Sequence, residues 1–223
     1  REALAKRLRK DDDWDVLWAS ARSLRRLAGP DDLELDYALI QSELDDWEED
    51  TLERLRANGD PARLIEALPN IEQDEFQAPI EAMILGWSPA PIKAAADALS
   101  NPRTVAIAAR VLGRAGADGS KHAKALSGSL TEQLEAWRAL RQRIDDGDAR
   151  SEDHSSFAET ETRLQWLCWA CGRVGVAAEA VLEAASLGGA RPQGRLIRHA
   201  ALEAIANGLG GAAGLDALAA AAA

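Results

Sequence analysis

The only two cysteines of the chain, Cys168 and Cys171, form a CxxC in the stretch RLQWLCWACGRVG. Such a pair can act as a redox dithiol or supply half of a zinc site. The redox function needs the first cysteine at a helix N-terminus, where the helix dipole lowers its pKa, but we expect this pair late in a helix. Residues with this spacing share one helix face, and free cysteine is often buried. We therefore expect both thiols in the core.

The histidines do not complete a metal or catalytic site. His122, His154 and His199 stand singly, and none belongs to an HExxH array. The stretch EDHSS (152–156) contains nucleophile-like residues, but we expect it in a loop that has no preorganised partner. The sequence therefore predicts no metal, no cofactor and no catalytic group, and it does not indicate a small-molecule substrate.

The composition limits the fold and the partners. Of 223 residues, 47% are hydrophobic and 4% aromatic. Alanine and leucine, which favour helices, dominate the apolar residues, so we expect an all-α fold. The net charge of −11 repels nucleic acids and anionic membranes at long range. We see no apolar run that could span a membrane and no signal peptide, and we expect a cytoplasmic protein with no membrane partner.

A repeat becomes visible when the expected helix ends are compared. The segment NPRTVAIAARVLGRAG (101–116) begins with Asn-Pro, which suits a helix start, and stops at a glycine, which suits a helix end. Similar segments close at Gly29, Gly59, Gly175 and Gly210. Their apolar anchors follow one another at about 30 residues, with one step twice as long, which is typical of stacked helix pairs. The anchors are Leu24, Leu55, Leu85, Leu112, Cys171 and Ile205.

The unit PAPIKAAADALSNPRTVAIAARVLGRAG (89–116) resembles a HEAT repeat of the short bacterial form that is also found in phycobilin lyases. The resemblance implies an α-solenoid of about six antiparallel helix pairs, as a single domain over residues 1–223. The long step between the anchors Leu112 and Cys171 departs from this repeat pattern. There we expect a helix to about Ile144, followed by an acidic loop inserted at about 145–160.

The repeat alignment brings arginines into register on the second helices of several pairs, while the last repeat has Glu203 and Asn207 at these positions. In HEAT-like solenoids these helices line the concave face, so the row can form a basic stripe that binds carboxylates or phosphates. The alternative is an internal ladder in which each arginine pairs with an acidic side chain of the adjacent repeat. The candidates are Arg22, Arg26, Arg110, Arg114 and Arg173, with Trp169 in register with Arg110.

Two tryptophans lie among acidic residues, in DDDWD (11–15) and ELDDWEED (43–50). Exposed, Trp14 and Trp47 would suit a basic protein partner, because tryptophan and complementary charge mark interaction surfaces. Buried, they would fill junctions between small-residue helices, as we expect for Trp18.

These observations favour a non-enzymatic scaffold or adaptor that binds another protein. The resemblance leaves two alternatives open: an enzyme of the phycobilin-lyase kind, or a nucleic-acid-binding protein of the alkylpurine DNA glycosylase kind. The acidic charge and the scarcity of lysine speak against nucleic acid.

Overall fold

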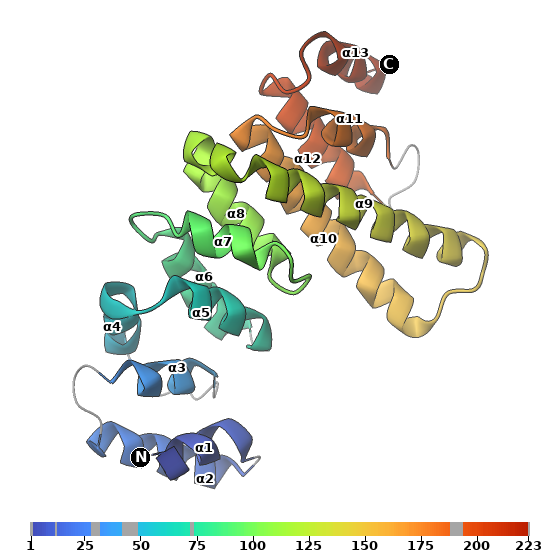
Figure 1. Cartoon of the computed structure of the whole chain (residues 1–223). Helices are drawn as coiled ribbons and strands as arrows, with labels where there is room; N and C mark the ends of the chain where they lie inside the picture. The colour runs from blue at the N-terminus through green and yellow to red at the C-terminus, as the bar shows by residue number, and fades with distance from the viewer. Residues whose placement is uncertain are drawn as a thin grey trace. The chain divides into compact units, whose positions relative to one another are not determined.

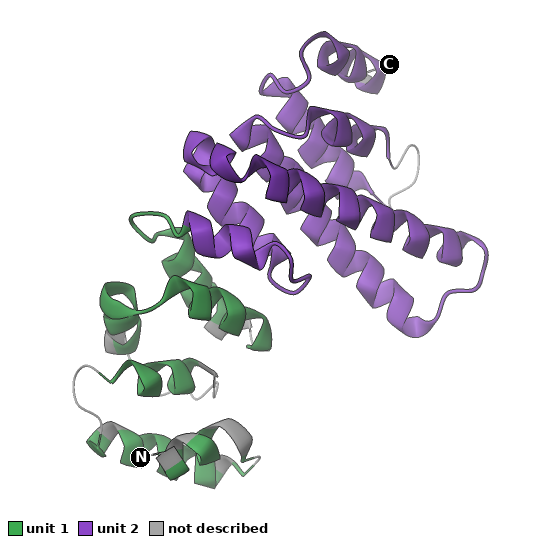
Figure 2. Cartoon of the chain, in the orientation of Figure 1, with its two compact units in different colours: residues 1–91 green, residues 92–223 purple. Residues whose placement is uncertain are grey.

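The computed structural model describes residues 2–11, 13–27, 32–41, 49–71, 74–187 and 194–222, and over these ranges the chain is helical with no strand. The predicted all-α class is confirmed. The part of the chain that the structure describes groups into two compact units, residues 1–91 and 92–223 (Figure 2). A single domain over residues 1–223 stays a prediction.

The first unit contains three consecutive pairs of helices in contact with each other: α1 with α2, α3 with α4, and α5 with α6 (Figure 1). Leu8, Leu24 and Leu39 are buried between the first three helices, with Trp18 partly buried against them. The helices are α1 (Glu2–Lys10), α2 (Trp14–Leu27), α3 (Leu33–Gln41), α4 (Glu49–Asn58), α5 (Pro61–Ala67) and α6 (Asp74–Leu85).

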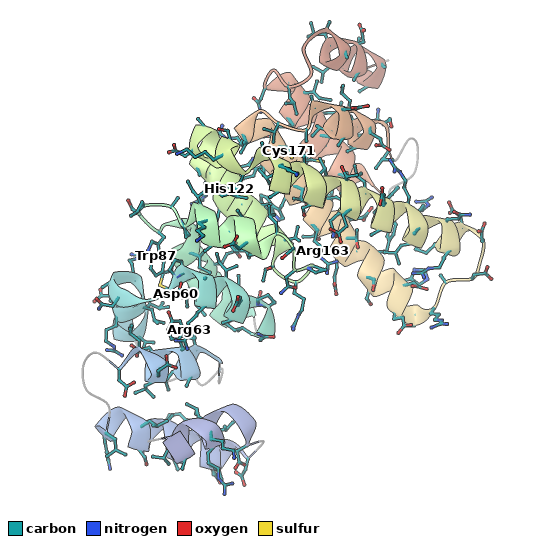
Figure 3. All side chains as sticks on the ribbon, viewed as in Figure 1. Asp60, Arg63, Trp87, His122, Arg163 and Cys171 are labelled. Carbon is teal, nitrogen blue, oxygen red and sulfur yellow. The ribbon has the colours of Figure 1, made fainter. Side chains whose placement is uncertain are left out.

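Two ion pairs join α3 to the helices that follow it. The guanidinium of Arg54 on α4 donates two hydrogen bonds, of 3.0 and 2.7 Å, to the carboxylate of Asp36. Arg63 on α5 donates to the carboxylate of Glu34 and lies over the ring of Tyr37, with 3.8 Å from Cζ to the ring centroid. Asp60 caps α5 by accepting a hydrogen bond from the Ala62 N–H (Asp60 and Arg63, Figure 3).

The second unit also contains three contacting pairs, α7 with α8, α9 with α10 and α11 with α12, followed by α13. The second helices of these pairs lie side by side, because α10 packs against α8 and against α12 (Figure 1). The helices are α7 (Ile92–Ala98), α8 (Val105–Ala115), α9 (Ala123–Asp145), α10 (Ser151–Val174), α11 (Ala178–Ser186), α12 (Arg195–Ala206) and α13 (Gly211–Ala222).

Two glycines allow the close approach of these second helices. A Cβ atom built on Gly113 of α8 would lie 2.8 Å from Cε3 of Trp169 and 3.1 Å from Cα of Ala170. A Cβ atom on Gly172 of α10 would lie 2.8 Å from Cα of Ala204 on α12. Each glycine therefore accepts an alanine backbone of the next second helix.

The predicted helix ends agree with the structure better than the predicted starts. α8 ends at Ala115 and α10 at Val174, and each is followed by the expected glycine, Gly116 or Gly175, with a positive φ. α12 ends at Ala206, before the expected Gly210, and the expected end at Gly29 lies outside the described residues. The expected start of α8 at Asn101 is wrong. Asn101 lies in the preceding turn, where its side chain accepts a hydrogen bond from the Arg103 N–H, and the helix begins at Val105.

The expected acidic loop at about 145–160 is also wrong for most of its length. α9 ends at Asp145, close to the expected Ile144, but the chain turns within 146–150 and is helical again from Ser151. The extra residues thus lengthen both helices of one hairpin. Trp137 and Phe157 pack together within it, with ring centroids 5.4 Å apart, and Asp153 accepts hydrogen bonds from Arg143 and from the Arg150 N–H.

Among the described helices, none is both long and apolar enough to cross a membrane.

Candidate functional site

The predicted arginine row falls into two groups, one in each unit. Arg22 and Arg26 are exposed on α2, and the Arg22 guanidinium lies 5.3 Å from the ring centroid of Trp18. The other candidates, Arg110, Arg114, Trp169 and Arg173, lie on α8 and α10 of the second unit. The structure connects Arg110 to Trp169 through Trp166, and Arg114 and Arg173 are exposed one turn further along α8 and α10. A single stripe that also includes Arg22 and Arg26 stays a prediction.

Arg110 and the tryptophans of α10 form the centre of the site. The Arg110 guanidinium carbon lies 4.5 Å from the ring centroid of Trp166. The rings of Trp166 and Trp169 meet edge to face, with centroids 5.8 Å apart and an interplanar angle of 87°. Both indoles are partly exposed. This arrangement combines a cation–π contact with an aromatic pair, each of which favours a fixed geometry.

Trp166 was not among the predicted site residues. The repeat alignment placed Trp169 opposite Arg110, whereas the guanidinium stacks on the residue one turn earlier in α10. A signal was present, because Trp166, Trp169 and Arg173 follow the spacing of residues that share one helix face.

Gly113 determines where the Trp169 ring lies. Because Gly113 has no side chain, the six-membered part of the Trp169 indole rests against α8 at that position. Sequence reasoning turned Trp169 outward, and the structure places it partly exposed, with its ring leaning on the neighbouring helix. An indole held in this way loses little conformational entropy when a ligand binds.

Burial and a neighbouring positive charge act on Arg110. Partial burial lowers the pKa of Arg110, and the positive charge of Arg114, one turn later, lowers it further. Arg173 is exposed on α10, one turn after Trp169. We call Arg110, Arg114, Trp166, Trp169 and Arg173 the Arg–Trp surface.

The charge around the Arg–Trp surface differs from that of the whole chain, whose net charge is −11. Three neighbouring segments, namely α8, residues 164–174 of α10, and α12, together contain one acidic residue, Glu203 of α12. The same segments contain the basic residues Arg110, Arg114, Arg173, Arg195 and Arg198. Earlier in α10, Arg163 pairs with Glu159, at 2.7 Å, and marks where acidic residues return.

The two cysteines lie beneath this surface, and their predicted burial is confirmed. Cys168 and Cys171 are both 0% exposed, and both are free thiols. Burial raises the pKa of Cys171 to about 12 and raises that of Cys168 as well. Thiols that remain protonated near neutral pH are poor nucleophiles and poor metal ligands.

The histidines are dispersed in the second unit: His122 ends a 3₁₀ turn (Gly116–His122), His154 lies in the first turn of α10, and His199 is exposed on α12. His154 was expected in a loop, which is corrected by the helix from Ser151. No group of three His, Cys, Asp or Glu side chains that could hold a metal ion is found among the described residues.

The structure does not test the prediction for the two tryptophans in acidic surroundings. Trp14 begins α2, but its side chain is outside the description, and Trp47 lies outside the described residues. Their exposure stays a prediction.

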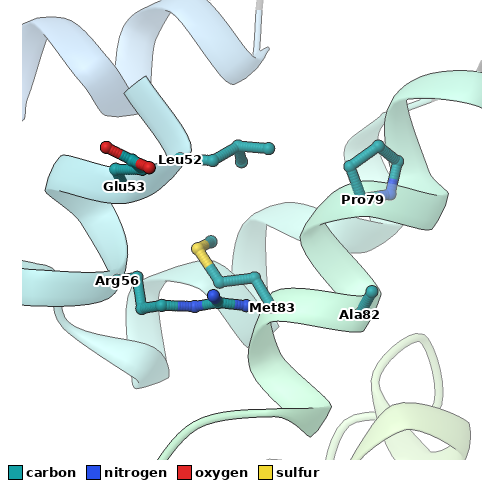
Figure 4. A pocket seen from close by; sticks show the side chains of 6 residues that line it. All are labelled: Leu52, Glu53, Arg56, Pro79, Ala82 and Met83. Atoms are coloured by element: carbon teal, nitrogen blue, oxygen red, sulfur yellow. The ribbon is translucent and has the colours of Figure 1, made fainter. Parts of the chain in front are cut away.

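A small groove lies between α4 and α6 in the first unit (Figure 4). Its volume is about 220 Å³. Leu52, Pro79 and Met83 provide its apolar lining, and Glu53 and Arg56 lie on its α4 side. Its lining residues form no set of groups typical of a catalytic site.

Comparisons of the chain with protein-family models, with curated proteins and with solved structures find no match. The resemblance to HEAT repeats therefore stays a prediction. The fold and the site define a class, an all-α protein of consecutive helix pairs with an arginine- and tryptophan-rich surface.

Proposed function

We propose that this chain is a non-enzymatic, HEAT-like scaffold that binds another protein through the Arg–Trp surface. The observation that carries the proposal is the stacking of Arg110 on Trp166, beside Trp169, on partly exposed helix faces. Arginine and tryptophan are the residues most enriched among those that dominate binding energy at protein interfaces.

The setting of the surface supports a protein partner. The surrounding segments of α8, α10 and α12 are basic, while the whole chain is strongly acidic, so an oppositely charged patch on a partner would be steered to one place. The buried, free thiols suit a reducing compartment, and we propose the cytoplasm as the location.

The experiment compares two charge-reversal variants in the full chain. Arg110→Glu with Arg114→Glu changes the Arg–Trp surface, and Lys93→Glu with Lys124→Glu makes the same change of net charge at exposed lysines of α7 and α9. Each protein is used for affinity purification from its host, with quantitative mass spectrometry. We expect one or a few proteins to be lost with the arginine variant and retained with the lysine variant.

The result counts only if the arginine variant remains folded. Its helicity and its thermal melting temperature, compared with those of the unmodified chain, provide this control. If both variants retain the same proteins as the unmodified chain, the Arg–Trp surface does not bind a partner and the proposal is wrong.

A further inference from the structure

The Arg–Trp surface has features that indicate which chemical groups its protein partner presents. Arg110 is partly buried and lies near the like charge of Arg114. The two arginines lie one turn apart on α8, and a guanidinium group binds a carboxylate through charge-assisted hydrogen bonds. The guanidinium carbon of Arg110 lies over the Trp166 ring, 4.5 Å from its centroid, and the planar guanidinium matches two-pronged partners such as carboxylates.

The indole rings of Trp166 and Trp169 form an apolar area of the surface next to the charged arginines. One face of Trp166 is covered by Arg110, and the Trp169 ring leans on Gly113, so both rings are held in place while remaining partly exposed. A ligand that binds here therefore has an apolar or aromatic group within a few ångströms of its negative charge. Acidic peptides with interspersed apolar side chains have this pattern.

We infer that the Arg–Trp surface binds an acidic peptide segment of a partner protein, with carboxylates on Arg110 and Arg114 and an apolar side chain against Trp166 and Trp169. The inference rests on the proposed function and names the kind of segment that is recognised.

The alternative anionic ligand is a single-stranded nucleic acid, which also combines negative charge with aromatic groups. Nucleic acid carries a charge on every nucleotide and needs a long basic track. Here the basic segment of α10 stops at Arg163, which pairs with Glu159, and the chain as a whole repels polyanions. A short peptide with a few carboxylates fits the limited basic area better.

The test selects random peptides of twelve residues by display on the full chain, followed by fluorescence anisotropy with the best binders. We expect the selected peptides to be rich in Asp and Glu beside Trp, Phe or Leu. Replacing their acidic residues by the amides is expected to weaken binding at least tenfold. Single-stranded oligothymidylate, used as a competitor, is expected not to displace them.

Protein variants connect the peptide to the site. Arg110→Lys keeps the charge but removes the two-pronged geometry, and we expect it to weaken binding about tenfold. Trp169→Ala is expected to weaken binding comparably, and the Lys93→Glu, Lys124→Glu protein to bind within about twofold of the unmodified chain.

Three results would overturn the inference: selected peptides without acidic residues, unchanged binding by the Arg110→Glu, Arg114→Glu protein, or tighter binding of the oligonucleotide. If no peptide is selected, the recognised feature is not a linear acidic segment. The proposed function would then still be decided separately by the affinity purification, because a folded partner can depend on Arg110 without offering such a segment.

Discussion

At the scale of single residues, Cys168 and Cys171 show how surroundings determine chemistry. A CxxC is a redox or metal motif where its thiols reach solvent and ionise, but here both are fully buried and their pKa values are raised. The two side chains are part of the buried core, and the predicted repeat alignment sets them opposite Ala109 and Leu112 of α8, which are also buried.

Burial of the thiols predicts slow labelling. In the native protein, a thiol reagent is expected to react at least about a hundredfold more slowly than in denaturant, because reaction requires local opening. Rapid labelling of the folded protein, measured by absorbance, would show that the cysteines are accessible.

The thiols also predict a loss of stability at alkaline pH. The pKa of Cys171 is about 12 in the folded protein, against an ordinary value of 9.0. The contribution of the protonated Cys171 thiol to the free energy of unfolding is complete below pH 9.0. It is lost as the pH rises toward 12, because in this range the thiol ionises only in the unfolded protein. Each thiol is expected to lower the free energy of unfolding by about 1.4 kcal/mol per pH unit in this range. Urea unfolding should show a shallower pH dependence for Cys168→Ala with Cys171→Ala, and an unchanged slope would contradict the assignment.

Gly113 is a second residue whose role depends on a neighbour. Gly113→Ala is expected to destabilise the protein by about 1–3 kcal/mol, because the new Cβ would meet the Trp169 ring and the Ala170 backbone. The control is Gly128→Ala on α9, where nothing lies within 4 Å of the new Cβ, so helix propensity should stabilise the protein by up to about 1 kcal/mol.

Chemical denaturation of both glycine variants measures the difference. Combining Gly113→Ala with Trp169→Ala should cost less than the sum of the two changes, since removing the indole removes one of the two clashes. Additive costs would mean that the ring can move aside without penalty.

At the scale of elements, helices of the first unit are joined by ion pairs of different burial. The Asp36 side chain is 1% exposed and that of its partner Arg54 is 33% exposed, while Glu34 and Arg63 are 70% and 43% exposed. The buried carboxylate has no access to water, so its hydrogen bonds with Arg54 cannot be replaced.

Removing charge from each pair should therefore have unequal effects. Asp36→Asn is expected to cost about 2 kcal/mol or more, because it weakens two charge-assisted hydrogen bonds and leaves Arg54 with a neutral partner. Glu34→Gln, the matched change at the exposed pair, should cost less than about 1 kcal/mol. Equal losses in urea unfolding would contradict this ranking.

The sequence predicted the helix pairs well where local signals are strong. Glycines after small-residue helices identified the ends of α8 and α10, because a positive φ is easily adopted only by glycine. The start of α10 was missed because residues 151–162 are polar and rich in Ser, Thr and Glu, which is typical of a loop. Their helical state depends on packing against α9, through Phe157 and Asp153, which local sequence does not reveal.

The candidate site was predicted in part. The repeat alignment identified Arg110, Arg114, Trp169 and Arg173, because register along equivalent helices follows from spacing alone. Trp166 could not be assigned its contact with Arg110, since that contact depends on the distance and rotation between α8 and α10. Those are set by Gly113 and Ala170, which as small residues give no chemical signal.

At the scale of the whole molecule, the division into two units can be tested directly. Residues 92–223 contain three helix pairs with buried residues of their own, including Leu112, Leu164 and Cys171. We expect this fragment, expressed alone, to be helical, to unfold cooperatively and to label its thiols as slowly as the full chain does. Fast labelling and a non-cooperative transition would indicate that the first unit is needed for folding of the second, as in a single continuous domain.

The nearly perpendicular packing of Trp166 and Trp169 has an optical consequence. Two indoles with centroids 5.8 Å apart are close enough for their excited states to couple, and a twisted pair of coupled transitions gives bands of opposite sign in circular dichroism. The molecule thus contains its own spectroscopic reporter at the Arg–Trp surface. Its signal would disappear with either tryptophan and would respond to a ligand that changes the angle between the rings, without any attached dye.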